Sequence, residues 1–249
     1  MSRVCKEKTI MKTFNRISKI FIAVILCVLI AISSVPFVSA LTAPKAPSKV
    51  LYRSDYAVDE HCLVITPKSA STGFQVTVIN ADGKTTYNKY FKCGVKSKEF
   101  YKLDKEYIVW NFHKQISNGQ FYTVKVRAFN ASDYKSGKPN NAKYSGWTST
   151  YAAETVTGAK ALRVNKNGGV KISWNKTKGA TCYTLRFVFV DNKAVRLGKT
   201  IKETNISLSK IGNVSLKNAK RITMEIVPVK LTKLAYHGAQ WKFHKLVIK

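Results

Sequence analysis

The stretch VKISWNKTKGATCYTLRF, Val170–Phe187, decides the fold class of this chain. Apolar and polar residues alternate from Val170 to Trp174, and the alternation resumes from Tyr183 to Phe187 after a polar connection. Successive side chains of a β-strand point to opposite faces of its sheet, so this period predicts strands with one buried and one solvated face. The stretch therefore predicts two consecutive strands of an antiparallel structure.

The same period recurs in the N-terminal half of the chain. Alternation runs from Phe74 to Val78, Asp82-Gly83 then supplies a tight hairpin turn, and Thr85–Phe91 follows as the returning strand. The segment Tyr122–Ala128 alternates most clearly of all. Nothing after residue 41 has the spacing of a long amphipathic helix, so we expect an all-β fold.

One pattern of apolar positions occurs twice and indicates an internal duplication. The spacing in Leu63–Val78 recurs in Val170–Phe187. The copies lie about 100 residues apart, which is the usual size of a small β-sandwich domain. We therefore predict two domains, 41–157 and 158–249, with the boundary in the stretch 154–160, which lacks apolar alternation.

The landmark residues of the second half resemble those of bacterial fibronectin type III domains. Trp174 stands where that family places the core tryptophan of the second strand, and Gly179-Ala180 and Tyr183 follow at the entry to the third. Ile222 stands in the place of the family's corner tyrosine, which is a departure. The resemblance implies an immunoglobulin-like sandwich of two packed sheets.

The first half carries other landmarks of the same family. Tyr122, with Ile116 six residues ahead and Asn118-Gly119 in the turn, resembles a tyrosine corner, whose hydroxyl bonds back to the backbone. Trp147 resembles the opening of the last strand. Pro67 departs from the pattern, and its missing N–H predicts that the second strand ends there or lies at an edge. Modules of this family commonly act as spacers, adhesion surfaces or accessories.

The first forty residues predict a secretory signal peptide with a helical apolar stretch. Six basic residues precede Ile20–Ile32, and Val38-Ser39-Ala40 gives a cleavage site with a mature start at Leu41. An uncleaved membrane anchor is the alternative, since Ile20–Phe37 nearly reaches the ~20 residues that a bilayer requires. The leader resembles those of Gram-positive bacteria. We expect a secreted, extracellular protein associated with the cell surface, with membrane contact only through a retained leader.

Positive charge concentrates in the second half of the chain. Residues 41–157 hold 17 Lys+Arg against 9 Asp+Glu, a net charge of +8, whereas residues 158–249 hold 20 against 3, a net charge of +17. Such charge attracts polyanions over about a Debye length, ~8–10 Å. The expected partners are anionic polymers: wall teichoic acid, acidic polysaccharide, anionic lipid headgroups or extracellular nucleic acid. The alternative is that the lysines only keep the protein soluble.

Three cysteines remain after the leader, namely Cys62, Cys93 and Cys182. In an oxidising exterior Cys62 and Cys93 can form a disulfide within the first domain, which leaves Cys182 as a buried thiol. Domains of this size have adequate cores without a disulfide, so the sequence leaves both states open.

The sequence offers no constellation for catalysis or metal binding. The four histidines lack metal-ligand spacing. No Gly-x-Ser-x-Gly elbow or glycine-rich phosphate loop occurs. Carboxylates in the second half are sparse and comprise Asp191, Glu203 and Glu225. We expect no enzyme activity, no cofactor and no metal.

The tryptophans raise the alternative of sugar binding, because an indole can stack on the face of a sugar ring. We expect Trp174 in the core and Trp147 packed near the end of its domain. Trp110 and Trp241 have polar neighbours and are the candidates for exposed ligand contacts, with core or rim packing as the alternative.

Together these features favour a secreted, non-catalytic binding or structural module that anionic wall polymer holds near its cell. An extracellular binder of nucleic acid or acidic polysaccharide is the second hypothesis, since the same charge attracts both. A secreted hydrolase with a site that the sequence conceals is the third, and no motif supports it.

Overall fold

The computed structural model describes residues 41–55, 60–95, 97–164, 168–232, 236–238 and 243–249. These residues belong to one compact unit, Leu41–Lys249. The expected signal segment, residues 1–40, lies outside the described residues. Within the described part of the chain, no helix has the length and apolar character needed to cross a membrane. Strands dominate, and the prediction of an all-β fold is confirmed.

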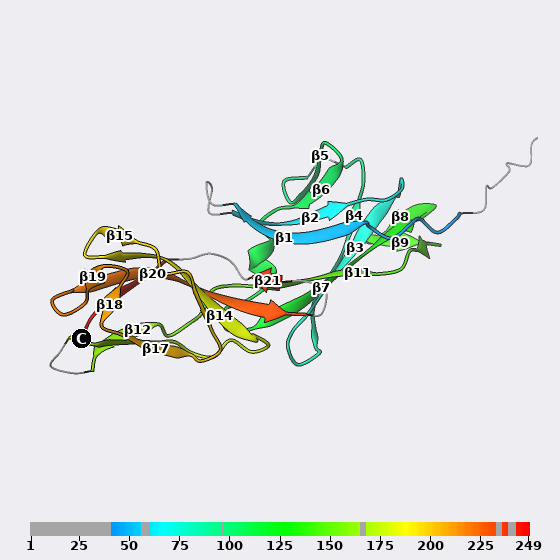
Figure 1. Cartoon of the computed structure of the whole chain (residues 1–249). Coiled ribbons are helices and arrows are strands. Elements are labelled where there is room, and N and C mark those ends of the chain that lie inside the picture. The colour runs from blue at the N-terminus through cyan, green and yellow to red at the C-terminus, as the bar shows by residue number, and fades with distance from the viewer. Residues whose placement is uncertain (1–40, 56–59, 96, 165–167, 233–235, 239–242) are drawn as a thin grey trace, which may run out of the picture. The chain divides into compact units, whose positions relative to one another are not determined.

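The N-terminal module, strands β1–β11, forms two main sheets (Figure 1). One sheet has the order β1-β2-β6-β5, and the other has the order β10-β7-β3-β4, with β11 also paired to β7. A short 3-10 helix, η1 (Phe112–Gln115), connects them between β6 and β7. The strand bounds are β1 (Lys49–Asp55), β2 (Glu60–Thr66), β3 (Gly73–Ile79), β4 (Thr85–Lys92), β5 (Phe100–Leu103), β6 (Glu106–Val109), β7 (Phe121–Asn130), β8 (Asp133–Lys135), β9 (Lys138–Asn140), β10 (Lys143–Tyr144) and β11 (Thr148–Ala153).

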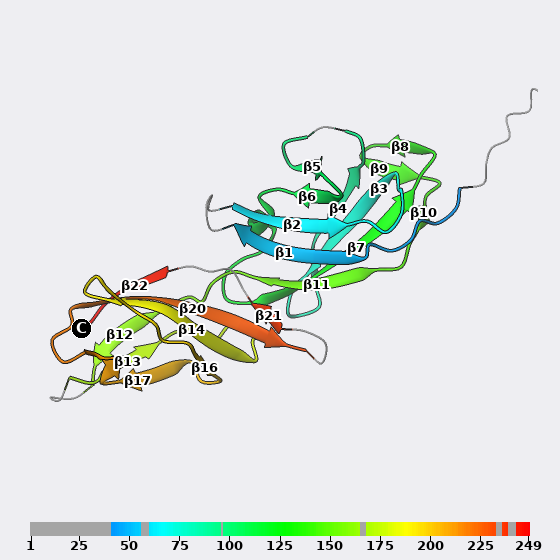
Figure 2. The same ribbon diagram turned by 45° about the horizontal axis from the view of Figure 1, so that its top comes forward.

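The C-terminal module, strands β12–β22, repeats this plan with its own two main sheets (Figure 2). One sheet has the order β12-β13-β17, and the other has the order β15-β14-β20-β21, with β16 paired to β14 and β22 to β20. The bounds are β12 (Lys160–Arg163), β13 (Val170–Ser173), β14 (Cys182–Val190), β15 (Lys193–Val195), β16 (Lys199–Ile201), β17 (Asn205–Leu208), β18 (Lys210–Ile211), β19 (Val214–Ser215), β20 (Arg221–Leu231), β21 (Tyr236–Gly238) and β22 (Phe243–Val247).

The strand order identifies the architecture. In each module the first two strands share a sheet with a later one, β6 or β17, while the third strand, β3 or β14, pairs with β7 or β20 in the other sheet. Two antiparallel sheets connected in this way make an immunoglobulin-like sandwich, the architecture that fibronectin type III domains share. The equivalent order in both modules agrees with the duplicated pattern of the sequence.

Each module has its own hydrophobic cluster, supplied by the inward-facing positions of its strands. In the N-terminal module Phe74, Val76 and Val78 are fully buried in one cluster. In the C-terminal module Val170 and Ile172 are fully buried in another. Alternation in the sequence therefore selects the residues that fill the space between the sheets.

The β3–β4 hairpin forms at the expected turn. Gly83 has φ +81°, a left-handed conformation that glycine adopts without steric cost. The Asn80 side chain supports the turn, because its Oδ1 accepts hydrogen bonds from the backbone N–H of Asp82 at 3.0 Å and of Lys84 at 2.9 Å. Strand β2 ends at Thr66, directly before Pro67. Proline has no N–H to donate to a neighbouring strand, so it favours the end of a strand at this position.

Glu154 and Thr155 are neighbours in the sequence, but their side chains form hydrogen bonds with different modules. Glu154 accepts a hydrogen bond from the Tyr52 hydroxyl of β1 at 2.6 Å. Thr155 is hydrogen-bonded instead to His244 of β22, with Oγ1 and Nε2 2.8 Å apart, and Val156 is buried in the C-terminal cluster. The division into domains 41–157 and 158–249 stays a prediction, and these contacts supply a sharper position at which to test it.

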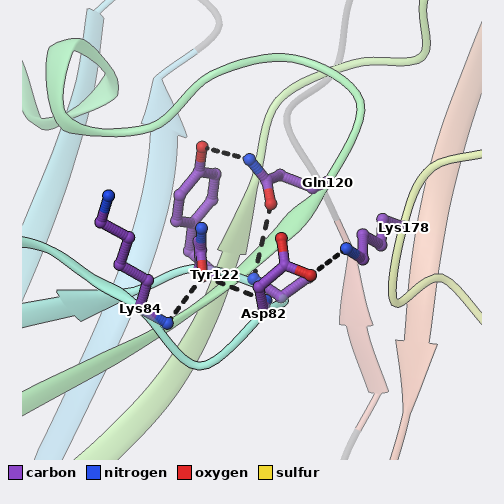
Figure 3. A network of polar contacts seen from close by, with 7 residues as sticks. Asp82, Lys84, Gln120, Tyr122 and Lys178 are labelled. Atoms are coloured by element: carbon purple, nitrogen blue, oxygen red, sulfur yellow. Dashed lines mark hydrogen bonds and ion pairs between the residues drawn. The ribbon is translucent and has the colours of Figure 1, made fainter.

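Contacts around Lys178 join the loop before β14 to the N-terminal module. The backbone N–H of Phe121 donates to the Lys178 carbonyl at 2.8 Å, and the Lys178 N–H donates to the Gly119 carbonyl at 2.8 Å. The Lys178 ammonium pairs with Asp82 in the β3–β4 turn (Figure 3). A small apolar cluster of Phe121, Ala153 and Val227 lies beside these contacts.

Candidate polyanion-binding surface

The C-terminal module carries its positive charge on exposed side chains. These side chains come from most of its strands and turns, so the charge covers the module instead of gathering at one strand. The exposed basic residues among those described are Lys160, Arg163, Lys171, Lys176, Lys178, Lys193, Arg196, Lys199, Lys202, Lys210, Lys217, Lys220, Arg221, Lys245 and Lys249.

The few carboxylates of this module do little to offset that charge. The Asp191 carboxylate accepts hydrogen bonds from the backbone N–H of Lys220, at 3.0 and 3.1 Å, and of Arg221, at 2.8 Å. Glu225 is buried, and its burial raises its pKa, while the nearby Arg186 acts in the opposite direction. Glu203, the third carboxylate, is exposed. The module thus keeps a large excess of accessible positive charge.

A shallow groove lies on the outer face of the sheet formed by β14, β20 and β22. Cross-strand pairing places Phe189 opposite Thr223 and Thr223 opposite Lys245, so these three side chains form one row. The groove has a volume of about 390 Å³ and is lined by Phe189, Asp191, Asn192, Arg221, Thr223, Lys245, Leu246 and Val247.

The groove combines cationic and aromatic groups. Arg221 and Lys245 supply the positive charge, and the Thr223 hydroxyl can donate or accept a hydrogen bond. The Phe189 ring is 38% exposed and packs edge-on against Phe243, with ring centroids 6.0 Å apart. A phosphate or carboxylate group can therefore meet two cations here while a ring or methylene chain lies against Phe189.

The landmark residues of the C-terminal module lie in its core. Trp174 and Tyr183 are buried and pack edge-to-face, with ring centroids 5.3 Å apart. The Tyr183 hydroxyl accepts a hydrogen bond from the backbone N–H of Thr177 at 2.9 Å. Ile222, at the position where the corner tyrosine was expected, is fully buried in the core cluster.

The landmark residues of the N-terminal module surround the turn before β7. Ile116, directly after η1, is buried in the core cluster. The Tyr122 hydroxyl accepts a hydrogen bond from the Ser117 backbone N–H at 3.2 Å. It accepts another from Gln120 Nε2 at 2.8 Å (Figure 3). Gln120 Oε1 in turn accepts one from the Ala81 N–H at 3.4 Å. The tyrosine therefore ties its own turn to the β3–β4 hairpin.

The remaining tryptophans differ in their exposure to solvent. Trp147, expected to pack near the end of its domain, lies directly before β11 and is 41% exposed. Trp110 is half-buried, with its ring centroid 6.2 Å from that of Tyr101. Trp241 lies outside the described residues. The role of Trp110 and Trp241 in sugar binding stays a prediction.

No disulfide joins Cys62 and Cys93 in this structure, and their pairing in an oxidising exterior stays a prediction. Cys62 belongs to β2, whereas Cys93 follows β4 at the edge of the other sheet. Burial raises the pKa of the Cys93 thiol, while hydrogen bonds with Tyr107 and Ser71 act in the opposite direction. Cys182 is a buried thiol.

No cluster of three or more His, Cys, Asp or Glu side chains suited to a metal occurs among the residues that the structure describes. His61 and His113 approach each other, with ring centroids 5.3 Å apart in an edge-on arrangement. They come from β2 and η1, so their sequence spacing could not have indicated the contact.

Sequence reasoning missed an aromatic and arginine surface on the N-terminal module. The Arg127 guanidinium contacts the rings of Tyr144 and Trp147, and cross-strand pairing places Gln75 beside it. Alternation along β3 and β7 does assign Gln75 and Arg127 to outward positions. The register that makes them neighbours depends on how the strands pair, which the pattern alone does not specify.

No protein-family model and no curated protein sequence matches this chain. Matching solved structures include a segment of two fibronectin type III domains from chicken tenascin, 13% identical, covering 82% of this chain and 99% of that chain, with a TM-score of 0.31. The central fibronectin type III array of RIM-binding protein matches with 12% identity over 84% of this chain and 72% of that chain, with a TM-score of 0.26. TM-scores this low do not establish a shared fold, so the fold assignment rests on the strand order within the chain.

Proposed function

We propose that this chain is a secreted, non-catalytic binding module that anionic wall polymer, such as teichoic acid, holds at the surface of a bacterial cell. The observation that carries the proposal is the net charge of +17 on residues 158–249, with 20 Lys+Arg against 3 Asp+Glu. Fifteen of its basic side chains are exposed among the described residues, and one of its three carboxylates is buried. A surface of this kind attracts any flexible polyanion and repels cations.

The groove on β14, β20 and β22 is a defined contact point on that surface. Arg221 and Lys245 flank Thr223, so successive anionic groups of a polymer can meet cations on neighbouring strands. The Asp191 carboxylate is turned to backbone donors and so competes little for these cations. We expect the groove to add to the general attraction without supplying most of it.

Salt dependence tests the attraction. The mature chain should bind purified teichoic acid and be released from cells by moderate salt, because screening shortens the reach of exposed charges. A double variant, R221Q/K245Q, should weaken binding more than K160Q/K171Q, which removes the same charge from the other sheet of the module. Retention at high salt would count against the proposal, and equal losses in the two variants would remove the role of the groove.

An extracellular binder of nucleic acid is the second candidate, and the exposed ring of Phe189 beside Arg221 favours it. Bases stack on aromatic side chains while cations contact the phosphates. This candidate predicts that single-stranded nucleic acid binds more tightly than a teichoic acid of equal charge, with a steep loss of affinity as salt rises. Replacement of Phe189 with alanine should then weaken nucleic acid binding and leave teichoic acid binding unchanged.

A further inference from the structure

Arg127 is held in one orientation on the outer face of the N-terminal module. Its guanidinium carbon lies 3.8 Å from the ring centroid of Tyr144 and 4.5 Å from that of Trp147. Its Nε donates a hydrogen bond to Gln75 Oε1 at 2.7 Å. Two aromatic rings and one hydrogen bond therefore restrain a side chain that ordinarily samples many rotamers.

The partner of Arg127 is itself fixed. Gln75 is buried, with 5% of its surface exposed, and its Nε2 donates to Asn88 Oδ1 at 2.8 Å. Asn88 lies on β4, Gln75 on β3 and Arg127 on β7, so the chain of hydrogen bonds crosses three paired strands. The sheet thereby sets the direction of the guanidinium before any ligand arrives.

The two terminal nitrogens of Arg127 have no hydrogen-bond partner among the described residues, and neither belongs to the buried polar atoms without partners. The side chain is half-exposed, so these nitrogens face solvent. A guanidinium in this state presents a planar pair of N–H donors, whose geometry matches a carboxylate in a bidentate contact. Such a contact loses little conformational entropy, because the side chain is already ordered.

Two aromatic rings, those of Tyr144 and Trp147, lie beside the Arg127 guanidinium. The Trp147 indole is 41% exposed, which leaves apolar ring surface available beside the guanidinium. Tyr90 and Tyr144 are half-buried, and burial followed by the contact with Tyr90 raises the pKa of Tyr144, while Arg127 acts in the opposite direction. An indole and phenolic hydroxyls beside a fixed cation suit a ring that carries both hydroxyl groups and a negative charge.

We propose that this surface binds saccharides that carry carboxylates, such as hexuronic acids, with the carboxylate on the terminal nitrogens of Arg127 and the sugar ring against the Trp147 indole. The surface belongs to the N-terminal module and is separate from the basic groove of the C-terminal module. Either site can therefore fail without the other.

The test uses the mature chain, a trimer of galacturonic acid and the methyl ester of that trimer, at about 0.15 M salt to limit general attraction. Calorimetry measures affinity, and the NMR signals of the indole N–H groups locate the ligand. The acid should bind at least about tenfold more tightly than its ester, because esterification removes the charge and keeps the ring. The Trp147 signal should shift most.

Two variants separate geometry from charge. R127K keeps the charge but loses the planar pair of donors, so affinity for the acid should fall at least about tenfold. K125Q removes one positive charge from the same face of β7, two residues away, and should change affinity by less than about twofold. W147A, at an exposed position, should weaken the binding of both the acid and the ester. It replaces R127K as the test variant if R127K does not fold.

Several results would overturn the proposal. These are equal affinity for acid and ester, wild-type affinity in R127K, a loss of affinity in K125Q equal to that in R127K, or no saturable binding of the acid. If R127K does not fold, wild-type affinity in W147A would also overturn it.

Discussion

The hydroxyl of Tyr183 accepts a hydrogen bond from the backbone N–H of Thr177, 2.9 Å away and six residues upstream. Tyr183 lies on β14 and Thr177 in the loop that leads into it. The hydrogen bond therefore holds this loop against the start of the strand. In the N-terminal module the corresponding bond joins Tyr122 of β7 to the Ser117 N–H at 3.2 Å. The two modules therefore place their tyrosine anchors on different strands.

Replacement of Tyr183 with phenylalanine should destabilise the protein by about 1–3 kcal/mol, because the buried N–H of Thr177 loses its acceptor while the core ring stays in place. Urea denaturation measures the change. Tyr122→Phe is the matched comparison, and it should also loosen the turn that Gln120 holds. An unchanged midpoint for Tyr183→Phe would mean that water replaces the hydroxyl at no cost.

Replacement of Gly73 with alanine should also destabilise the protein, by about 1–3 kcal/mol. A Cβ at this position would lie 2.2 Å from the Phe91 carbonyl oxygen and 2.5 Å from Cζ of Phe129. The carbonyl belongs to the backbone of the paired strand β4 and cannot move without breaking the ladder. Gly146→Ala is the control, since its Cβ would meet nothing within 4 Å. Thermal unfolding distinguishes the two variants.

Replacement of Glu225 with glutamine should raise the melting temperature at neutral pH by ~2–4 °C, because burial disfavours the charged carboxylate and glutamine carries no charge. Burial raises the folded-state pKa above 4.5, so the folded protein binds the proton more tightly than the unfolded chain does. The stabilisation from protonated Glu225 is thus present at low pH and is lost as pH rises through the folded pKa.

The difference between Glu225→Gln and the wild type should therefore shrink as pH falls from 7 toward about 4. Calorimetric scans across that range measure it. Glu203→Gln is the control, because Glu203 is exposed. A difference that grows on acidification would show that Glu225 is stabilised as the anion.

Separate expression tests the division of the chain. We expect 41–154 and 155–249 each to fold, since each retains one hydrophobic cluster. The fragment 155–249 should be more stable than 158–249, by about 1.5–3 kcal/mol, because Val156 is buried in the C-terminal cluster. Denaturation of both fragments supplies the comparison. Equal stability would place the boundary at 157/158, and a failure of either half to fold alone would show that the modules depend on each other.

The sequence specified the strands that fill the two cores. Alternation marked Phe74–Val78, Tyr122–Ala128 and Val170–Trp174, and the side chains facing inward there are buried. The hairpin at Asp82-Gly83 was predictable too, because a left-handed turn needs a residue such as glycine. Signals of this kind are local, so they can be read along the chain without knowing the fold.

Tertiary structure alone decided which outward-facing residues meet. Arg127 reaches Gln75 through strand pairing and reaches Trp147 through the path of the chain before β11, and neither contact follows from period two. Alternation also does not reveal that Cys62 and Cys93 lie in one module but on different sheets. The net charge belongs to the sequence. The groove that places Arg221 near Lys245 exists only because β20 and β22 pair in one register, which depends on packing across the whole sheet.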